Sequence, residues 1–214
     1  MTFPPVSSTD ATPRPTGKGA RTREAILQLA VAHACRVGLA GLTIGDLATA
    51  AGMSKSGMYA HFGSKEAMQI AVLDTAAQEF ANGVVVPALA AARGEPRVRA
   101  LVENWLECGR TREPGGCVIV KASIELDEQP GPVRDHLREL HETLDDAIAR
   151  IVEGGAREGH FRADVDGRQF AFDLYAVMLG FHHAYRLLDD PRAEARARAA
   201  VEMLIAAARP EENR

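Results

Sequence analysis

The chain has 214 residues, a formal net charge of −4 and 46% hydrophobic residues. This length allows one domain or two small ones with a real hydrophobic core, and an acidic net charge alone argues against a nucleic-acid binder. The charge distribution reverses that interpretation, because residues 1–65 hold seven Lys/Arg and three Asp/Glu (+4), whereas the remainder holds 18 and 26 (−8). A basic N-terminal part on an acidic body would orient the protein on DNA.

The first 20 residues combine four prolines with Ser, Thr and Gly, and we expect a disordered arm over residues 1–20. Arg14, Lys18 and the adjoining Arg21 can contact phosphates or a minor groove, as basic arms of other DNA-binding proteins do. A merely solvated tail is the alternative. The arm lacks the apolar core of a signal peptide, and no apolar run approaches the roughly 20 residues of a membrane span. We therefore expect a cytoplasmic protein with reduced cysteines.

Residues 43–65 predict two short helices joined by a tight turn. Thr43 precedes apolar residues at helical spacing and can cap the first helix with its hydroxyl. Gly52 supplies the positive φ of a sharp helix exit, Met53 offers an apolar plug, and Ser54 can cap the second helix. A turn of three or four residues between two helices is typical of a helix-turn-helix, the DNA-binding motif.

The second helix, about residues 55–61, places Met58 and Phe62 on one inward face at i and i+4. Its other side chains remain outside, where they suit a major groove. A helix start at Ser64 and Lys65 then offers both N–H groups and a positive charge to a phosphate. The residues expected to contact DNA are Thr43, Ser54, Lys55, Ser56, Gly57, Tyr59, His61 and Lys65, of which Lys55 and Gly57 are expected to influence base choice.

The segment 22–70 resembles the DNA-binding domain of the TetR (tetracycline repressor) family of bacterial regulators, over roughly a quarter of the chain. Two departures from the family pattern are a His33–Ala34 pair in place of large apolar residues, and Ala60 in place of a bulkier residue. The resemblance implies a small-molecule site in the helical body and a ligand-driven movement of the helix after Lys65. The matching residues are Gly38, Thr43, Ala51, Gly52, Tyr59, His61, Phe62, Ser64, Lys65 and Glu66.

Beyond residue 65 the pattern stays helical, and Pro and Gly cluster at a few breaks. We therefore predict an all-α protein of about nine helices, with a three-helix DNA-binding domain at 21–65 and a ligand-binding and dimerisation domain at 66–214. The helices expected in the second domain cover about 65–92, 96–110, 116–127, 131–158, 166–188 and 191–208.

The predicted helix 166–188 is apolar nearly all round, so it needs cover on two faces. The following helix, 191–208, is rich in alanine, which permits close approach. We predict a two-fold dimer through a four-helix bundle of these two helices, and the resemblance implies the same. A core helix of a monomer is the alternative. Two recognition helices would then enter successive major grooves about 34 to 36 Å apart.

Apolar and amphipathic residues on the predicted body helices are candidates for a pocket wall, with an apolar or aromatic effector. Ordinary core positions are the alternative for each of them. The candidates are Trp105, Cys108, Cys117, Tyr175, Met178, Phe181 and His182.

Enzyme and metal chemistry find little support in the sequence. No His has an acid three positions earlier, as a di-iron bundle requires, and Cys-x-x-Cys, Gly-x-Ser-x-Gly, P-loop and dinucleotide motifs are missing. A redox role for Cys117, near a helix start, is a minor alternative. We expect a cofactor-free repressor that binds a palindromic operator; the competing class is a helical ligand-binding protein or enzyme whose helix-turn-helix is only structural. Operator, regulated genes, effector, and repression versus activation are not given by the sequence.

Overall fold

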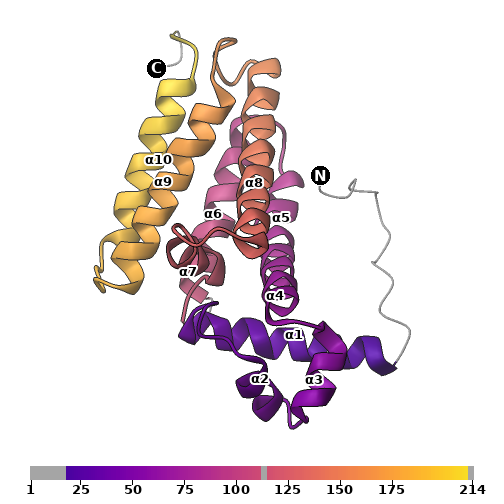
Figure 1. The fold of residues 1–214 in the computed structure, drawn as a ribbon. Helices are drawn as coiled ribbons and strands as arrows, with labels where there is room; N and C mark the ends of the chain where they lie inside the picture. The colour runs from indigo at the N-terminus through magenta and orange to yellow at the C-terminus, as the bar shows by residue number, and fades with distance from the viewer. Residues whose placement is uncertain (1–17, 112–114, 212–214) are drawn as a thin grey trace. The chain divides into compact units, whose positions relative to one another are not determined.

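The computed structural model describes residues 18–111 and 115–211, and these residues form helices joined by turns (Figure 1). The expected arm, including Arg14, lies outside them except for its last three residues, which begin the first helix, and the side chains of Lys18 and Arg21 are not described either. The helices are α1 (Lys18–Val37), α2 (Ile44–Ala50), α3 (Lys55–Phe62), α4 (Lys65–Phe80), the π-helix η1 (Ala81–Val85), α5 (Val86–Leu89), α6 (Glu95–Thr111), α7 (Val118–Glu125), α8 (Pro132–Arg157), α9 (Gly167–Arg186) and α10 (Ala193–Ala208).

The all-α prediction is confirmed, and the described residues form nine helices when the continuous run 65–89 is counted as one. Each expected body helix is present with ends within a few residues of the prediction, because the Pro and Gly clusters do end helices. Gly94, Gly131 and Gly159 all have positive φ in the connections between them. The first helix begins at residue 18, three residues before the expected boundary.

The π-helix is a feature that the periodicity did not predict. In it the Val86 N–H bonds to the Ala81 carbonyl, five residues back. Pro87 follows, and because proline has no N–H, the ordinary bond to the carbonyl four residues earlier cannot form there. The Asn104 amide of α6 donates to the Val84 carbonyl at 3.1 Å. A π turn placed beside a proline is one recognised way to interrupt a helix.

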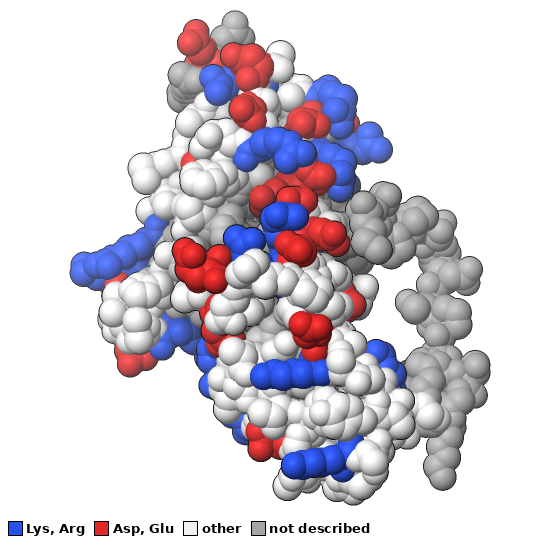
Figure 2. Space-filling model, in the orientation of Figure 1, with Lys and Arg blue, Asp and Glu red and all other residues white. Residues whose placement is uncertain are grey.

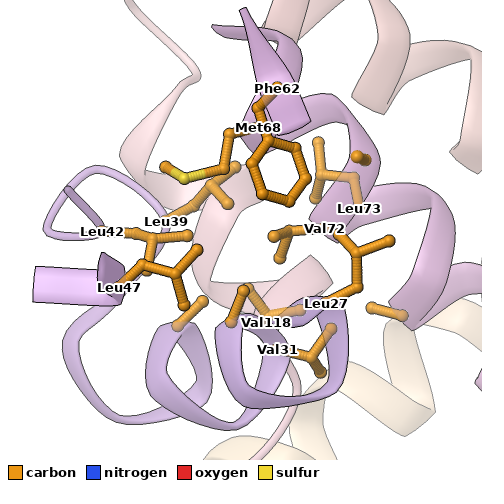
Figure 3. Close-up of a cluster of buried hydrophobic side chains, with 14 of the residues drawn as sticks. Leu27, Val31, Leu39, Leu42, Leu47, Phe62, Met68, Val72, Leu73 and Val118 are labelled. Atoms are coloured by element: carbon orange, nitrogen blue, oxygen red, sulfur yellow. The ribbon is translucent and has the colours of Figure 1, made fainter. Parts of the chain in front are cut away.

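The chain forms two compact units, each with its own hydrophobic core. The first unit combines residues 1–78 and 113–143, so α7 and the first half of α8 belong with α1 to α4. Its core includes Leu39, Leu47 and Met68, all fully buried (Figure 3). Val118 of α7 lies in the same cluster, which shows that a segment far along the chain completes the core formed by α1 to α4.

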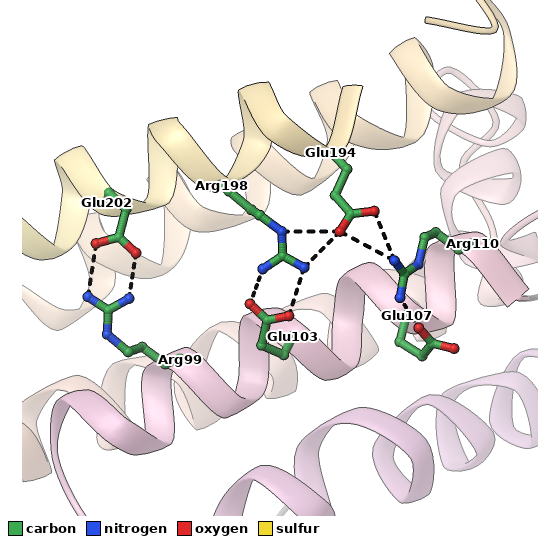
Figure 4. Close-up of polar contacts among 7 residues, drawn as sticks. All are labelled: Arg99, Glu103, Glu107, Arg110, Glu194, Arg198 and Glu202. Atoms are coloured by element: carbon green, nitrogen blue, oxygen red, sulfur yellow. Dashed lines mark hydrogen bonds and ion pairs between the residues drawn. The ribbon is translucent and has the colours of Figure 1, made fainter. Parts of the chain in front are cut away.

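The second unit combines residues 79–112 and 144–214. Leu106, Ile148 and Leu174 are buried in its core, and α9 and α10 pack side by side along their length (Figure 1). A line of Arg–Glu pairs joins α6 to α10 (Figure 4). It includes Arg99 with Glu202 and Arg198 with both Glu103 and Glu194. This line of ion pairs holds α6 and α10 against each other, in addition to the apolar core of the unit.

Within the described part of the chain, no helix is long and apolar enough to cross a membrane. The same residues contain no group of three His, Cys, Asp or Glu side chains placed to hold a metal ion. Cys35, Cys108 and Cys117, all described, form no disulfide.

Candidate nucleic-acid interface

Helix α2 begins at a side-chain cap. The Thr43 hydroxyl accepts from the Asp46 N–H at 3.0 Å and donates to an Asp46 carboxylate oxygen at 2.6 Å. The cap satisfies one of the four N–H groups that a helix start leaves open. Thr43 is exposed, but its hydroxyl is already engaged in both directions, so its first role is to start α2.

The turn between α2 and α3 has the geometry expected from Gly52. The Gly52 N–H bonds to the Thr49 carbonyl and the Met53 N–H to the Ala48 carbonyl, while Gly52 has a φ of 64°. This pair of bonds is a Schellman motif, which glycine favours because it adopts positive φ without strain. Met53 is half-buried and packs against the core, as predicted.

Helix α3 presents one buried and one exposed face. Met58 and Phe62 are 0% and 7% exposed, so the predicted inward pair is confirmed. The Ser54 hydroxyl accepts from the Gly57 N–H at 3.1 Å and caps the helix. Tyr59 is 52% exposed. Half of this two-turn helix is therefore free of core contacts and can enter a groove of DNA.

The exposed face contains most of the residues that the sequence singled out. Lys55, Ser56 and Tyr59 are exposed, whereas Gly57 and His61 are half-buried. A Cβ added at Gly57 would lie 3.2 Å from the Ser54 hydroxyl, so a larger residue would press on the cap. The glycine thus keeps both the cap and a smooth patch of backbone on the exposed face.

The side chain of Lys55 folds toward the start of α2. Its Cε and Nζ would lie 3.1 and 3.5 Å from a Cβ added at Gly45. Because an amino group at this point is near the first turns of both α2 and α3, the helix N-terminal N–H groups and the lysine charge can act on one phosphate.

At the start of α4, Ser64 caps the helix as predicted, since its hydroxyl accepts from the Ala67 N–H at 3.0 Å. The exposed Lys65 donates from Nζ to the Ala40 carbonyl at 3.0 Å. Lys65 therefore holds the turn before α2 in this structure, a contact that sequence spacing alone could not have indicated.

One contact that the sequence reasoning missed is made by Arg23. Its guanidinium lies 5.3 Å from the centre of the Phe62 ring, so α1 places a positive charge beside the end of α3. Residues 22–65 hold four Lys/Arg and two Asp/Glu (+2). On the visible face, the region of α2 and α3 is mostly uncharged with isolated charged residues (Figure 2).

Six of the seven pocket candidates belong to the second unit, whereas Cys117 is the residue before α7 in the first unit. Trp105 is central among the six: its ring centre lies 5.1 Å from that of Phe80 and 6.3 Å from that of Tyr175. Met178 and Phe181 are buried core residues, while Cys108 and His182 are half-buried. Phe80, which directly precedes the π-helix, was missed because α4 has no clear periodic signal at its end.

Helices α9 and α10 expose apolar residues at helical spacing. On α9, Phe172 is 67% and Leu179 is 40% exposed, and on α10 Met203 is 67% exposed. Exposed alanines continue both stripes, at residues 176, 195, 199 and 206. Exposed apolar residues at helical spacing on two adjacent helices are typical of a protein–protein contact surface.

Comparison with known proteins gives two family matches. Residues 26–72 match the model described as "Bacterial regulatory proteins, tetR family", and residues 94–201 match "Tetracyclin repressor-like, C-terminal domain". The transcriptional repressor KstR2 of Rhodococcus jostii (strain RHA1) is 27% identical over 178 residues, which are 78% of this chain and 77% of the relative.

Solved structures with the same fold include a TetR transcriptional regulator from Chloroflexus aurantiacus J-10-FL. It is 27% identical, with a TM-score of 0.78 over 88% of this chain and 94% of that one. AibR in complex with isovaleryl coenzyme A and operator DNA is 22% identical, with a TM-score of 0.68 over 86% and 98% of the two chains. The second likeness is one of fold.

Proposed function

The chain belongs to the TetR family of bacterial regulatory proteins, and from this membership we propose that it is a homodimeric repressor released from a palindromic operator by a small-molecule effector. As a member of this family, the protein is a DNA-binding transcriptional regulator and not an enzyme. We also propose that the protein is located in the cytoplasm, where it can reach the chromosome.

The observation that best supports operator recognition is the exposed face of α3, capped by Ser54 and supported from beneath by Met58 and Phe62. Lys55 and Gly57 are proposed to influence base choice, and the charge of Lys55 is also proposed to neutralise a phosphate. Ser54, Ser56, Tyr59, His61 and Lys65 are proposed to contact the backbone of DNA, by hydroxyl, imidazole or ammonium donation to phosphate oxygens. Thr43 is proposed to lie beside the DNA backbone as the cap of α2, since its hydroxyl proton is already bonded to the Asp46 carboxylate.

The first experiment is selection of bound sequences from a random duplex pool, followed by affinity measurements at two salt concentrations. A palindrome with a steep salt slope is the expected result, because neutralised phosphates release counterions. Lys55→Met should reduce the slope by about one unit and weaken binding. Arg138→Gln removes the same charge from an exposed position on α8 and should leave both unchanged; equal effects of the two variants would contradict the assignment.

The homodimer is proposed from the exposed apolar stripes of α9 and α10. Met203→Glu should produce monomers in analytical ultracentrifugation and abolish tight operator binding, because a buried unpaired charge is costly and one half-site binds weakly. Ile124→Glu is the matched control for sedimentation and should leave the dimer intact, since Ile124 is also exposed (70%) but lies on α7. A wild-type protein that sediments as a monomer at micromolar concentration would refute the dimer.

A small-molecule effector is proposed to bind near the Phe80–Trp105–Tyr175 aromatic cluster in the second unit. The π-helix beside Phe80 supports this location, since π turns are frequent at functional sites. An effector with an apolar or aromatic part suits such a wall, and the AibR complex shows that a protein of this fold can hold an acyl-coenzyme A and operator DNA.

The effector proposal can be tested by fluorescence, because Trp105 is the only tryptophan of the chain. Acyl-coenzyme A thioesters and aromatic carboxylates should be titrated into the protein and into its operator complex. A ligand that changes Trp105 emission and releases the operator supports the proposal. If no member of the panel changes emission or melting temperature, the proposed location is wrong.

A further inference from the structure

The C-terminal end of α1 is held by a side chain from α7. Lys121 donates from Nζ to the Cys35 carbonyl at 2.5 Å and lies 3.4 Å from the Arg36 carbonyl. The last four carbonyls of a helix have no partner within it. An ammonium at this end satisfies two of them and also opposes the negative end of the helix dipole.

A second side chain of α7 holds the turn that follows α1. Glu125 accepts the Ala40 N–H at 2.9 Å. Its carboxylate fits because residue 38 is glycine: a Cβ there would lie 1.8 Å from the Glu125 carboxylate, and the φ of 82° also favours glycine. Lys121 and Glu125 are one helical turn apart on α7, so the same face of α7 holds both points.

The segment before α7 approaches α1 just as closely. A Cβ added at Gly115 would lie 2.1 Å from the Cys35 carbonyl oxygen, and Gly115 also has a positive φ, 98°. Gly38 allows the Glu125 carboxylate to approach the backbone, and Gly115 allows its own backbone to approach the Cys35 carbonyl. No larger residue fits at either position, so these contacts fix the position of the α7 segment more narrowly than a surface ion pair does.

The same turn is also bonded to α4. Lys65 donates to the Ala40 carbonyl at 3.0 Å, and the buried Gln69 amide donates to the Leu39 carbonyl at 2.9 Å. Ala40 is therefore bonded through its N–H to α7 and through its carbonyl to α4. Three residues later Thr43 caps α2, so the direction of the helix-turn-helix depends on where this turn is held.

We propose that α7 is a second positioning element of the helix-turn-helix, which acts through Lys121 and Glu125 on residues 35–40. It operates in addition to α4, whose side chains hold the other side of the same turn. The two residues do not contact DNA; they set the orientation of α2 and α3 and thereby the affinity for the operator. The inference rests on the proposed operator binding.

The central test compares Glu125→Ala with Glu125→Gln in the full-length protein. The alanine variant loses the acceptor for the Ala40 N–H, and operator affinity should fall by about fivefold or more, the lower range of coupling between sites. The glutamine variant keeps an acceptor oxygen and should retain affinity within about twofold. Glu128→Gln, which removes a charge from an exposed position near the end of α7, is the control and should bind as wild type.

Lys121→Met should lower operator affinity in the same direction, because it keeps the length of the side chain but removes the ammonium. In the double variant with Glu125→Ala, the two losses should not add, since both act on one turn. Amide hydrogen exchange at residues 38–42 should be faster in each variant without DNA, which reports the turn independently of the operator.

The melting temperature separates positioning from mere stability. A residue that only stabilises the fold lowers the melting temperature but leaves operator affinity unchanged at 25 °C, where the protein remains folded. Operator affinity unchanged in Glu125→Ala, with wild-type protein binding its palindrome, would overturn the inference alone. A wild-type protein that selects no DNA sequence would overturn the proposed function, and the inference with it.

Discussion

The two units of the molecule use different polar contacts around similar apolar cores. In the first unit, long side chains of α4 and α7 bond to backbone groups of residues 35–40. In the second, Asn104 also bonds to a backbone carbonyl, but α6 and α10 are joined by Arg and Glu side chains that bond to each other (Figure 4). The fold fixes the position of a backbone group, whereas the Arg198 side chain bonds both Glu103 and Glu194 and can shift toward either. Contacts to the backbone therefore fix the position of a segment. Pairs of side chains hold two helices together but allow small adjustments.

The largest effect is expected from substitutions in the hydrophobic core that each unit contains. Leu47 and Leu174 are each 0% exposed, one in each unit. Leu47→Ala and Leu174→Ala should each lower the free energy of unfolding by about 2–5 kcal/mol, through lost burial and the cavity that remains. Urea denaturation measures this loss, provided that the variant and the wild type have the same dependence of unfolding free energy on urea concentration. A loss below about 1 kcal/mol in either variant would show that its unit does not depend on the core described.

The next effect concerns backbone contacts, and two glycines form a matched pair. Gly38 and Gly52 both have positive φ, but a Cβ at Gly38 meets Glu125 whereas nothing lies within 4 Å of one at Gly52. Gly52→Ala should cost about 1–2 kcal/mol from backbone conformation alone. Gly38→Ala should cost distinctly more in urea denaturation, and the excess should shrink when Glu125 is also alanine. Equal costs would mean that the carboxylate moves aside freely.

A smaller effect is expected at the cap of α2. Thr43→Ala should lower the free energy of unfolding by about 1 kcal/mol, because it removes the acceptor for the Asp46 N–H. Thr49→Ala is the control: the Thr49 hydroxyl bonds only back to the Gly45 carbonyl of the same helix, and alanine is the better helix former. Thermal denaturation of both variants should therefore show a loss for the first and no loss for the second.

The smallest effect sharpens the contrast with the second unit. Hydrogen bonds from Arg209 and then Arg99 hold the pKa of Glu95 below its ordinary value of 4.5. A carboxylate whose pKa is lowered by folding adds stability above the unfolded pKa, and this is lost as the pH falls through the folded pKa. Glu95→Gln should cost about 1 kcal/mol or less at pH 7, and the difference from wild type should disappear as the pH falls through the lowered pKa of Glu95. A difference that persisted in acid would show that Glu95 acts through packing.

The salt dependence of the cost of a substitution provides a second comparison of the two units. Screening weakens exposed ion pairs much more than buried contacts. The cost of Glu95→Gln should therefore decrease in high salt, while the cost of Gly38→Ala should not. Similar salt dependence of the two variants would remove the distinction between the units.

Local chemistry made the helices predictable from the sequence. Thr43, Gly52 and Ser54 act within three residues of themselves, so their roles as caps and turn could be recognised from spacing alone, and Met58 and Phe62 followed from helical period. The contacts that join distant segments could not. The bond from Lys65 to the Ala40 carbonyl was not foreseen, and nothing in the spacing of Lys121 and Glu125 indicates that their partners lie about 85 residues away.

The candidate pocket residues show the same limit of prediction from the sequence. Trp105 and Tyr175 were predicted by chemical type as candidates for a pocket wall, and their ring centres lie 6.3 Å apart. Cys117 was grouped with them because it is on a body segment, but it belongs to the other compact unit. A linear boundary at residue 65 cannot indicate that the chain returns at residue 113 to complete the first core.

The π-helix before Pro87 has a consequence for the length of the chain. A π turn contains one residue more than the α-helical path through the same space, so Ala81–Val85 can be regarded as a one-residue insertion retained within a continuous helix. Without a π turn, an added residue would rotate every later side chain of an α-helix by about 100°. The wider turn takes up the extra residue instead, so that Ala88 stays buried in its core. The π-helix therefore preserves the facing of the residues that follow it.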